Sequence, residues 1–452
     1  LFVDPDTGNG NLVKARTLIN QYQQFRMAGL GDNNEMLKTA LFTAGKDQDT
    51  WSPVNLEDAD TLGKIFKYNV LNADQNQKHL AQLFDVLYTE DERDTDLDKG
   101  FRGHPSIGAA VMTNTLKLDN VEPWRTFRNN VSNDINNGLD VNVFFAGSIF
   151  GGTGAAGFPT IPRLIRNEFS NQGNLKIGGA LMLPYFSFIP GPEAECNGLR
   201  ASSEYFLLNT RASLEYYANQ NYDQIFDAIY ILGYESLKQM KDFSIGASTQ
   251  RNEPHLLEMY AALAAIRFFS SDEVGSFIIG KGNKDGINWD DFKNVIQNEN
   301  RQSPLYQKVT QFSRFAYVFL TVYYPALEEI RNGGDPTRAA WYWDFFEKKG
   351  ISIRDKAVSN KMEYVKQYCK VYLDWMKDIH DLEPEVVGML NKYALDNIGD
   401  GNFNSLVTGI TDDDKALKRI WNRMCSYNVK DKSSTEEGRF LNALYDCCQM
   451  DA

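Results

Sequence analysis

Residues 141–166 constrain the fold of this chain more than any other stretch, because they combine a strand-like run, a glycine-rich loop and a helix-like run. The first five of them, VNVFF, are the β-branched and aromatic residues of a short buried strand. The loop reads GSIFGGTGAAG, and its glycines allow the backbone to approach an anion closely. The positive end of the following helix dipole would add to that attraction. The alternative is a purely structural turn between a strand and a helix.

The loop differs from two common phosphate-binding motifs. No Gly-Lys-Ser/Thr follows it, which excludes the P-loop. Residues 152–157, GTGAAG, have the GxGxxG spacing, but no acid follows about 20 residues further on, which argues against a dinucleotide-dependent oxidoreductase.

The composition is that of a soluble globular protein large enough for two domains, with 452 residues of which 42% are hydrophobic. A net charge of −13 argues against nucleic acid or an anionic membrane as the main partner. No apolar run approaches the roughly 20 residues that span a bilayer. The five scattered cysteines predict a reducing, cytoplasmic location. The four histidines form no cluster, which argues against a zinc site.

The pattern of elements divides the chain into two parts. Residues 1–300 alternate strand-like and helix-like segments, which predicts an α/β domain with a parallel sheet. The expected strands lie at 1–4, 141–146, 177–183 and 228–232, and the expected helices at 11–27, 76–88, 106–117, 159–169, 200–219 and 254–269. Residues 301–452 predict a mainly helical C-terminal domain, with helices at 305–331, 336–348, 354–379, 384–396, 413–427 and 434–449.

The glycine-rich loop resembles the signature loop of the tubulin/FtsZ superfamily, and the chain resembles a prokaryotic tubulin-like protein. The family pattern is close to GGGTGTG, between a central strand and a helix. The matching positions here are Gly147, Gly151, Gly152, Thr153, Gly154 and Ala155. The resemblance implies that these residues contact the phosphates of GTP or GDP. It also implies a nucleotide-binding domain over 1–300, with a central helix near 254–269. The helical 301–452 departs from the mixed α/β second domain of the family.

Two further segments resemble family loops. The run GFRGHPSIGAAV at 100–111 is similar to the loop that senses the γ-phosphate, with Gly103 and Gly108 at matching places. Its alternative is an ordinary loop before a helix. The opening FVDPDTGN is similar to the loop whose acid holds Mg²⁺, which would make Asp4 and Asp6 the metal-binding residues. Its alternative is an Asp-Pro turn. If the resemblance holds, the chain begins at the family's second strand, and the first strand is absent from this sequence.

The base-binding and catalytic positions match less completely. Asn252 stands near the family's second guanine-binding asparagine, with a helix N-cap as the alternative. Tyr234 stands near the first, which leaves the choice between guanine and adenine open. Asn288 and Asp290 resemble the catalytic Asn-x-Asp of the FtsZ loop that positions the attacking water. Lys293 replaces the second acid there, and the residues themselves favour a strand edge followed by a helix cap.

Two functions follow as hypotheses from the resemblance. In the first, the chain binds and hydrolyses GTP with Mg²⁺, and head-to-tail self-association into filaments or oligomers completes each site. In the second, the chain is a scaffold that binds nucleotide without hydrolysis and offers its helical domain to protein partners. Cytoskeletal positioning, plasmid partition and phage defence all stay open as processes.

Overall fold

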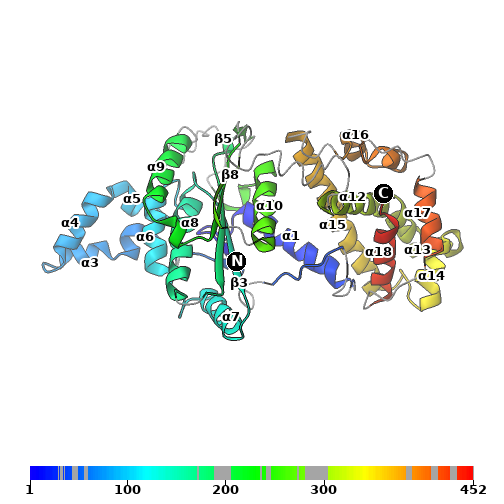
Figure 1. Cartoon of the computed structure of the whole chain (residues 1–452), viewed down its shortest axis with the longest axis horizontal. Coiled ribbons are helices and arrows are strands. Elements are labelled where there is room, and N and C mark those ends of the chain that lie inside the picture. The colour runs from blue at the N-terminus through cyan, green and yellow to red at the C-terminus, as the bar shows by residue number, and fades with distance from the viewer. Residues whose placement is uncertain are drawn as a thin grey trace. The chain divides into compact units, whose positions relative to one another are not determined.

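The computed structural model of the chain describes residues 1–28, 30, 34, 36–42, 49–54, 60–170, 173–187, 205–234, 237–240, 246–271, 274–279, 304–382, 389–408, 416–427 and 435–450. The chain divides into two compact units (Figure 1). The first comprises Leu1–Lys14, Phe42–Asn252 and Leu257–Trp289. The second comprises Ala15–Leu41, Glu253–Leu256 and Asp290–Ala452. The segment Ala15–Leu41 thus groups with the C-terminal residues, although it is close in sequence to the first unit.

A parallel sheet forms the centre of the first unit and confirms the predicted α/β class. Within the described residues it has four strands in the order β3-β4-β6-β8. These strands are β3 (Val141–Ser148), β4 (Leu175–Met182), β6 (Ala228–Leu232) and β8 (Gly275–Ile279). Two small parallel pairs accompany the sheet: β1 (Phe2–Val3) with β2 (Thr50–Trp51), and β5 (Phe186–Ser187) with β7 (Lys238–Gln239).

Two adjacent glycines of β4 allow helices to pack tightly on both faces of this sheet. A Cβ on Gly178 would lie 2.7 Å from the ring of Phe268, which belongs to α10 (Leu256–Ser270). A Cβ on Gly179 would lie 2.6 Å from the ring of Phe158, which belongs to α8 (Gly152–Glu168). Because successive strand residues point to opposite faces, α10 and α8 cover opposite sides of β4. Parallel sheets are generally covered in this way.

The remaining helices of the first unit are short, apart from α7 and α9. They are α2 (Leu62–Ile65), α3 (Tyr68–Ala73), α4 (Lys78–Leu87), α5 (Glu90–Asp94), α6 (Pro105–Thr115), α7 (Trp124–Asn136), α9 (Phe206–Ala218), η3 (Tyr222–Gln224) and η4 (Ala247–Thr249). Helix α1 (Gly10–Met27) starts in this unit. Helices α3 and α4 lie side by side, away from the sheet (Figure 1).

Helix α8 begins earlier than the sequence predicts. The prediction placed it at 159–169, whereas it runs from Gly152 through two internal prolines. Pro159 has no N–H to donate to the carbonyl of Ala155, four residues earlier. The buried hydroxyl of Tyr217 donates to that carbonyl instead, at 2.8 Å. A side chain from α9 therefore replaces the helical hydrogen bond that Pro159 cannot make, which helps the helix to continue through this proline.

The second unit is helical within its described residues, as predicted. Its elements are the later part of α1, α12 (Pro304–Val318), η5 (Phe319–Tyr323), α13 (Tyr324–Arg331), η6 (Pro336–Arg338), α14 (Ala340–Phe345), η7 (Glu347–Lys349), α15 (Lys356–Leu382), α16 (Lys392–Asp396), η8 (Asp400–Ser405), α17 (Ala416–Cys425) and α18 (Glu436–Cys447). Helices α12 and α13 continue through η5, which is one π-helical turn. Tyr323 at its end packs against Trp341, with ring centroids 4.9 Å apart, and Trp341 stacks on Phe440. Aromatic side chains thus form much of this core.

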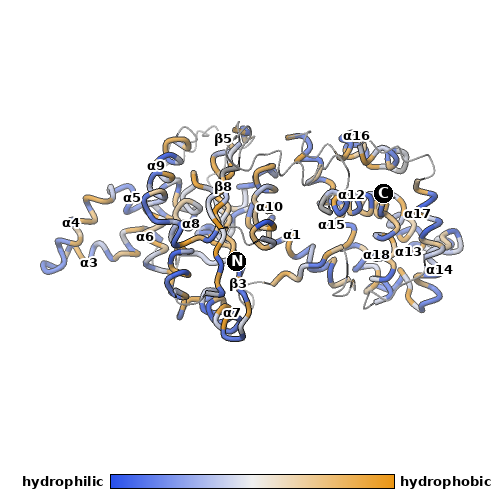
Figure 2. Tube along the Cα trace, in the orientation of Figure 1, coloured by the Kyte–Doolittle hydropathy of each residue, from blue (hydrophilic) through white to orange (hydrophobic). Residues whose placement is uncertain are grey.

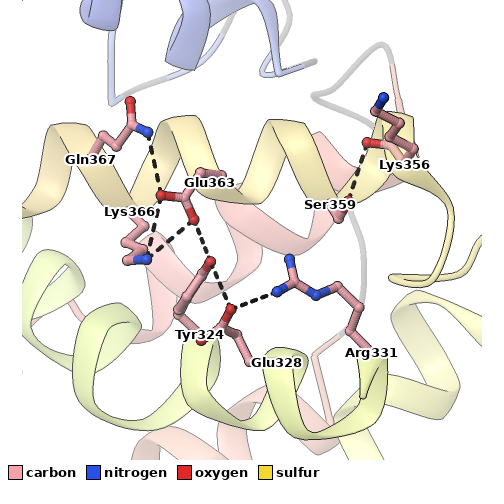
Figure 3. Close-up of polar contacts among 8 residues, drawn as sticks. All are labelled: Tyr324, Glu328, Arg331, Lys356, Ser359, Glu363, Lys366 and Gln367. Carbon is pink, nitrogen blue, oxygen red and sulfur yellow. Dashed lines mark hydrogen bonds and ion pairs between the residues drawn. The ribbon is translucent and has the colours of Figure 1, made fainter. Parts of the chain in front are cut away.

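A polar network joins α13 to α15 at the edge of that core (Figure 3). The hydroxyl of Tyr324 donates to the carboxylate of Glu363 and, at 3.3 Å, to Glu328. Lys366 donates to Glu363 at 3.2 Å and also lies over the ring of Tyr324. Arg331 pairs with Glu328 at 2.9 Å. The network holds two helices together and satisfies the hydroxyl of a tyrosine that is mostly buried.

The distribution of hydropathy along the helices fits the packing described above. Many helices alternate hydrophobic and hydrophilic stretches along their trace, as amphipathic helices do (Figure 2). Among the described residues, no helix combines the length and the apolar character needed to cross a membrane.

Candidate nucleotide-binding site

The glycine-rich loop lies at the carboxyl edge of the parallel sheet, where open α/β sheets bind their ligands. Strand β3 ends at Ser148, and α8 begins four residues later with Gly151 as its N-cap. Gly151 has no side chain that could accept hydrogen bonds from the first turn of α8. The first N–H groups of a helix have no partner within the helix. The start of α8 therefore offers donors of the kind that bind an anion.

The first turn of α8 folds back onto the end of β3. A Cβ on Gly154 would lie 2.5 Å from the carbonyl oxygen of Ser148 and 2.9 Å from its nitrogen. Only glycine fits at such a distance from backbone atoms. Gly147 lies in β3 beside this contact, and Thr153 is half-buried in the same turn. Ala155 is buried one residue further.

Phe150 anchors the loop from within and was not predicted as a site residue. Its side chain is buried, and its ring lies 4.8 Å from that of Phe206 on α9 and 5.1 Å from that of Phe186 on β5. Tyr185 contacts the same ring edge-on. The sequence signal was an aromatic residue within a glycine-rich loop, which predicts an anchored loop rather than a fully solvated one.

The second predicted loop, at 100–108, packs directly against the first. A Cβ on Gly152 would lie 2.8 Å from the Cβ of Phe101 and 3.1 Å from the backbone nitrogen of Gly103. Gly103 and Arg102 both have positive φ, at 80° and 46°. Gly108 lies on α6 against Phe101 and Ala156. The structure therefore brings Gly103 and Gly108 together with the glycines of the first loop, as the resemblance implies.

The acidic residues Asp4 and Asp6 follow β1 and lie close together. The backbone N–H of Asp6 donates to Oδ1 of Asp4 at 2.9 Å, and Oδ2 of Asp6 accepts from the N–H of Ala247 at 2.6 Å. Burial raises the pKa of Asp4 to about 6, and the charge of Asp6 acts in the same direction. The Asp-Pro turn is thus real, and Asp6 also fixes the turn at 246–247. Among the described residues, no group of three or more His, Cys, Asp or Glu could by itself hold a metal ion.

These acids connect to the 99–103 turn. A Cβ on Gly246 would lie 3.0 Å from Oδ2 of Asp6 and 3.3 Å from the Cβ of Lys99. Lys99 and Arg102 are the basic residues of that turn. They supply local positive charge beside the glycine loops of a chain whose net charge is −13.

Asn252 lies in the segment before α10 but is not its N-cap, because α10 begins four residues later, at Leu256. Its backbone N–H donates to Oδ1 of Asn11 at 2.6 Å. Nearby, the amide of Asn9 donates to the side chain of Gln250. The N-cap alternative is therefore wrong, and Asn252 lies beside the start of α1. Its role toward a base stays a prediction.

The structure brings most of the predicted residues into one region. Residues 4–6 contact the turn at 246–247, that turn contacts the turn at 99–103, and the 99–103 turn contacts the glycine loop at 151–154. Asn288, Asp290 and Lys293 lie outside the described residues, so their predicted catalytic role stays a prediction.

Comparison with known proteins gives one match. A family model described as tubulin-like matches residues 101–311, which include both glycine loops, the four-stranded sheet and α10. No curated protein and no solved structure matches the chain. The match therefore supports a tubulin-like family for this chain, and it agrees with the parallel α/β fold observed over most of the matched residues.

Proposed function

We propose that this chain is a tubulin-like protein that binds GTP or GDP at the carboxyl edge of its parallel sheet. In this proposal the start of α8 and the turn at 99–103 hold the phosphates. Asp4 and Asp6 hold Mg²⁺ through water molecules, and Asn252 contacts the base.

The observation that carries the proposal is the conformation of Gly151. Its φ and ψ of −91° and 165° are accessible to any residue. A Cβ there would meet only the movable hydroxyl of Ser148, at 3.3 Å. The packing of the loop therefore does not require glycine at this N-cap, whereas the close approach of an anion to the helix start does.

The two carboxylates fit a magnesium ion that is shared with phosphate oxygens. Mg²⁺ usually keeps several waters and takes one or two protein carboxylates in such sites. Asp4 and Asp6 supply two, and the raised pKa of Asp4 marks a carboxylate that a cation would stabilise in its charged form.

We further propose that the nucleotide is hydrolysed when a second copy of the chain completes the site head-to-tail. Asn288 and Asp290 would then position water for attack on the γ-phosphate, since phosphoryl transfer depends mainly on positioning and charge stabilisation. The competing function is a scaffold that binds nucleotide without turnover. The tyrosine at 234 and the lysine at 293 favour it, because both replace residues of the family pattern.

Nucleotide content and turnover test these proposals. Bound nucleotide is released from the purified full chain and identified, and phosphate release from GTP and ATP is measured across protein concentrations. Gly151→Ala should lose nucleotide, whereas Gly157→Ala should keep it, because a Cβ on Gly157 makes only ordinary contacts at 3.5 Å. A protein that binds no nucleotide with Mg²⁺ present would refute the proposal.

Turnover then separates the two functions. Specific activity that rises steeply with concentration, and that Asp290→Ala abolishes with nucleotide still bound, indicates a shared catalytic site. Asp291→Ala is the matched control. Bound nucleotide without turnover at any concentration indicates the scaffold.

A further inference from the structure

Helix α4 presents an apolar stripe to solvent. Its buried side chains, Ala81 and Phe84, face the neighbouring elements. Four other apolar residues are exposed, and they define the α4 stripe: Leu80 (43%), Leu83 (54%), Val86 (82%) and Leu87 (59%). At 3.6 residues per turn they cover roughly 120° of the helix surface, next to the face of Ala81 and Phe84, and the exposed His79 lies within the same sector. Single exposed apolar residues are common, whereas a continuous stripe marks a contact surface.

The spacing of the α4 stripe fits another helix. Leu80, Leu83 and Leu87 follow the three-four spacing at which side chains interlock along a helix seam. Between Leu80 and Leu87 the one acidic or basic residue is Asp85, which lies on the opposite side of the helix from the stripe and pairs with Arg93. At the axis of a two-fold contact a side chain faces its own copy, so a charge in the middle of the stripe would face a like charge. The α4 stripe has none.

The charges at the two ends favour an antiparallel arrangement. Lys78 begins α4, and the acidic residues Glu90 and Asp91 begin α5 just beyond its end. In an antiparallel pair centred on Leu83, Leu83 faces its own copy, Leu80 lies opposite Val86 of the other chain, and Lys78 comes near the acidic end of the other chain. A parallel pair would bring like charges together.

The area is sufficient for a weak dimer. The α4 stripe exposes roughly 400 Å² of apolar surface per copy, which is within the range of patches that have a function in monomers. Two copies contribute about 800 Å², which suits a weak, concentration-dependent contact and is below the roughly 1,000 Å² of a stable specific interface.

We propose that α4 is an isologous self-association surface, through which two copies of this chain pair antiparallel about Leu83. This contact is closed and two-fold, so it differs from the open head-to-tail contact of the proposed function. The two can coexist, and the α4 contact would then join pairs of chains laterally.

Sedimentation velocity of the full chain across protein concentrations tests this proposal. The wild type should form a dimer as its concentration rises, and Leu83→Glu should stay monomeric at tenfold higher concentration. Leu139→Glu is the matched control, because Leu139 is also 54% exposed and lies outside α4. An unchanged thermal transition of Leu83→Glu shows that the variant is folded. A wild type that stays monomeric, or a dimer that Leu83→Glu leaves intact, overturns the proposal.

Two further variants test the arrangement. Lys78→Glu should weaken the dimer, and adding Glu90→Lys should restore it. Leu83→Cys should form a disulfide-linked dimer on mild oxidation, whereas Leu139→Cys should not. Failure of both the charge exchange and the cross-link overturns the antiparallel pairing. Nucleotide content is measured on the same samples to separate the two proposals. A dimer without nucleotide refutes the proposed function alone. A monomer with nucleotide refutes the α4 contact alone.

Discussion

Replacing Asp4 by asparagine isolates the energetic effect of a buried charge in the candidate site. Burial raises the pKa of Asp4 from its ordinary 3.8 to about 6. A pKa difference of about two units corresponds to a free-energy difference of about 3 kcal/mol between the charged and the protonated form of Asp4. Asparagine has the same shape and can still accept the Asp6 N–H through its own Oδ1. The substitution therefore removes the charge and preserves the hydrogen bond.

The sign of the effect follows from the order of the two pKa values. Below about pH 4, Asp4 is protonated in the folded and the unfolded chain, so wild type and Asp4→Asn should be equally stable. Between about pH 4 and 6 the unfolded chain loses its proton first, which favours unfolding of the wild type. The variant should therefore gain stability relative to the wild type through this window and be about 3 kcal/mol more stable at pH 7.

Urea unfolding at pH 4, 5, 6 and 7, followed by circular dichroism without divalent cations, measures this difference. Asp335→Asn is the control. Hydrogen bonds from Thr337 lower the pKa of Asp335, so its contribution is lost only below its ordinary 3.8 and should be constant from pH 4 to 7. A stability difference for Asp4→Asn that does not change with pH would refute the assignment of a charge destabilised by burial. If Asp4 also holds Mg²⁺, adding magnesium with nucleotide should stabilise the wild type and leave Asp4→Asn unchanged.

Three further experiments test the packing. Gly154→Ala should destabilise the first unit by about 1–3 kcal/mol in thermal unfolding, because the added Cβ would overlap backbone atoms. Gly157→Ala is the control and should leave the stability unchanged, because its Cβ has room. Phe150→Ala should cost about 3–5 kcal/mol in the same measurement, and a loss below 1 kcal/mol would show that the ring does not anchor the loop. A double-mutant cycle of Tyr324→Phe and Glu363→Gln should give a coupling of about 1–2 kcal/mol at pH 7, and additive effects would refute the network. Because hydrogen bonding holds the pKa of Glu363 below its ordinary 4.5, this coupling should disappear as the pH falls below that value.

Local patterns predicted the elements that have strong hydrophobic signals. The strand at 141–146 and the loop after it were found from β-branched and glycine residues, and the structure has β3 there. Helix α7 was not predicted, because its sequence WRTFRNNVSNDIN is rich in asparagine, a weak helix former. Only Trp124 and Val131 of α7 are fully buried, two turns apart, so its apolar periodicity is weak as well. Strand β8 was missed because its apolar run is only three residues long, Phe277–Ile279, whereas all five residues of β6 are apolar.

The candidate site depends on contacts between residues far apart in the chain, which no local pattern reveals. Asp6 and Ala247 are 241 residues apart, as are Asn9 and Gln250. The resemblance to a family supplied the order of the loops, and the structure shows that several of them touch. The resemblance could not identify Phe150, because this residue acts through packing, which only the structure shows, rather than through a motif.

The glycines of the loop are required for different physical reasons, and these reasons bear differently on the structural and the functional interpretation of the loop. Gly154 is required by the backbone of Ser148, so a purely structural turn would need it as well. Gly152 is required by the contact with Phe101, which any close packing of α8 on the 101–103 turn would impose. Gly151 has neither constraint, and its conformation suits any residue. An anion bound at the start of α8, as proposed, would account for this glycine, so the functional interpretation depends on Gly151 rather than on the number of glycines in the loop.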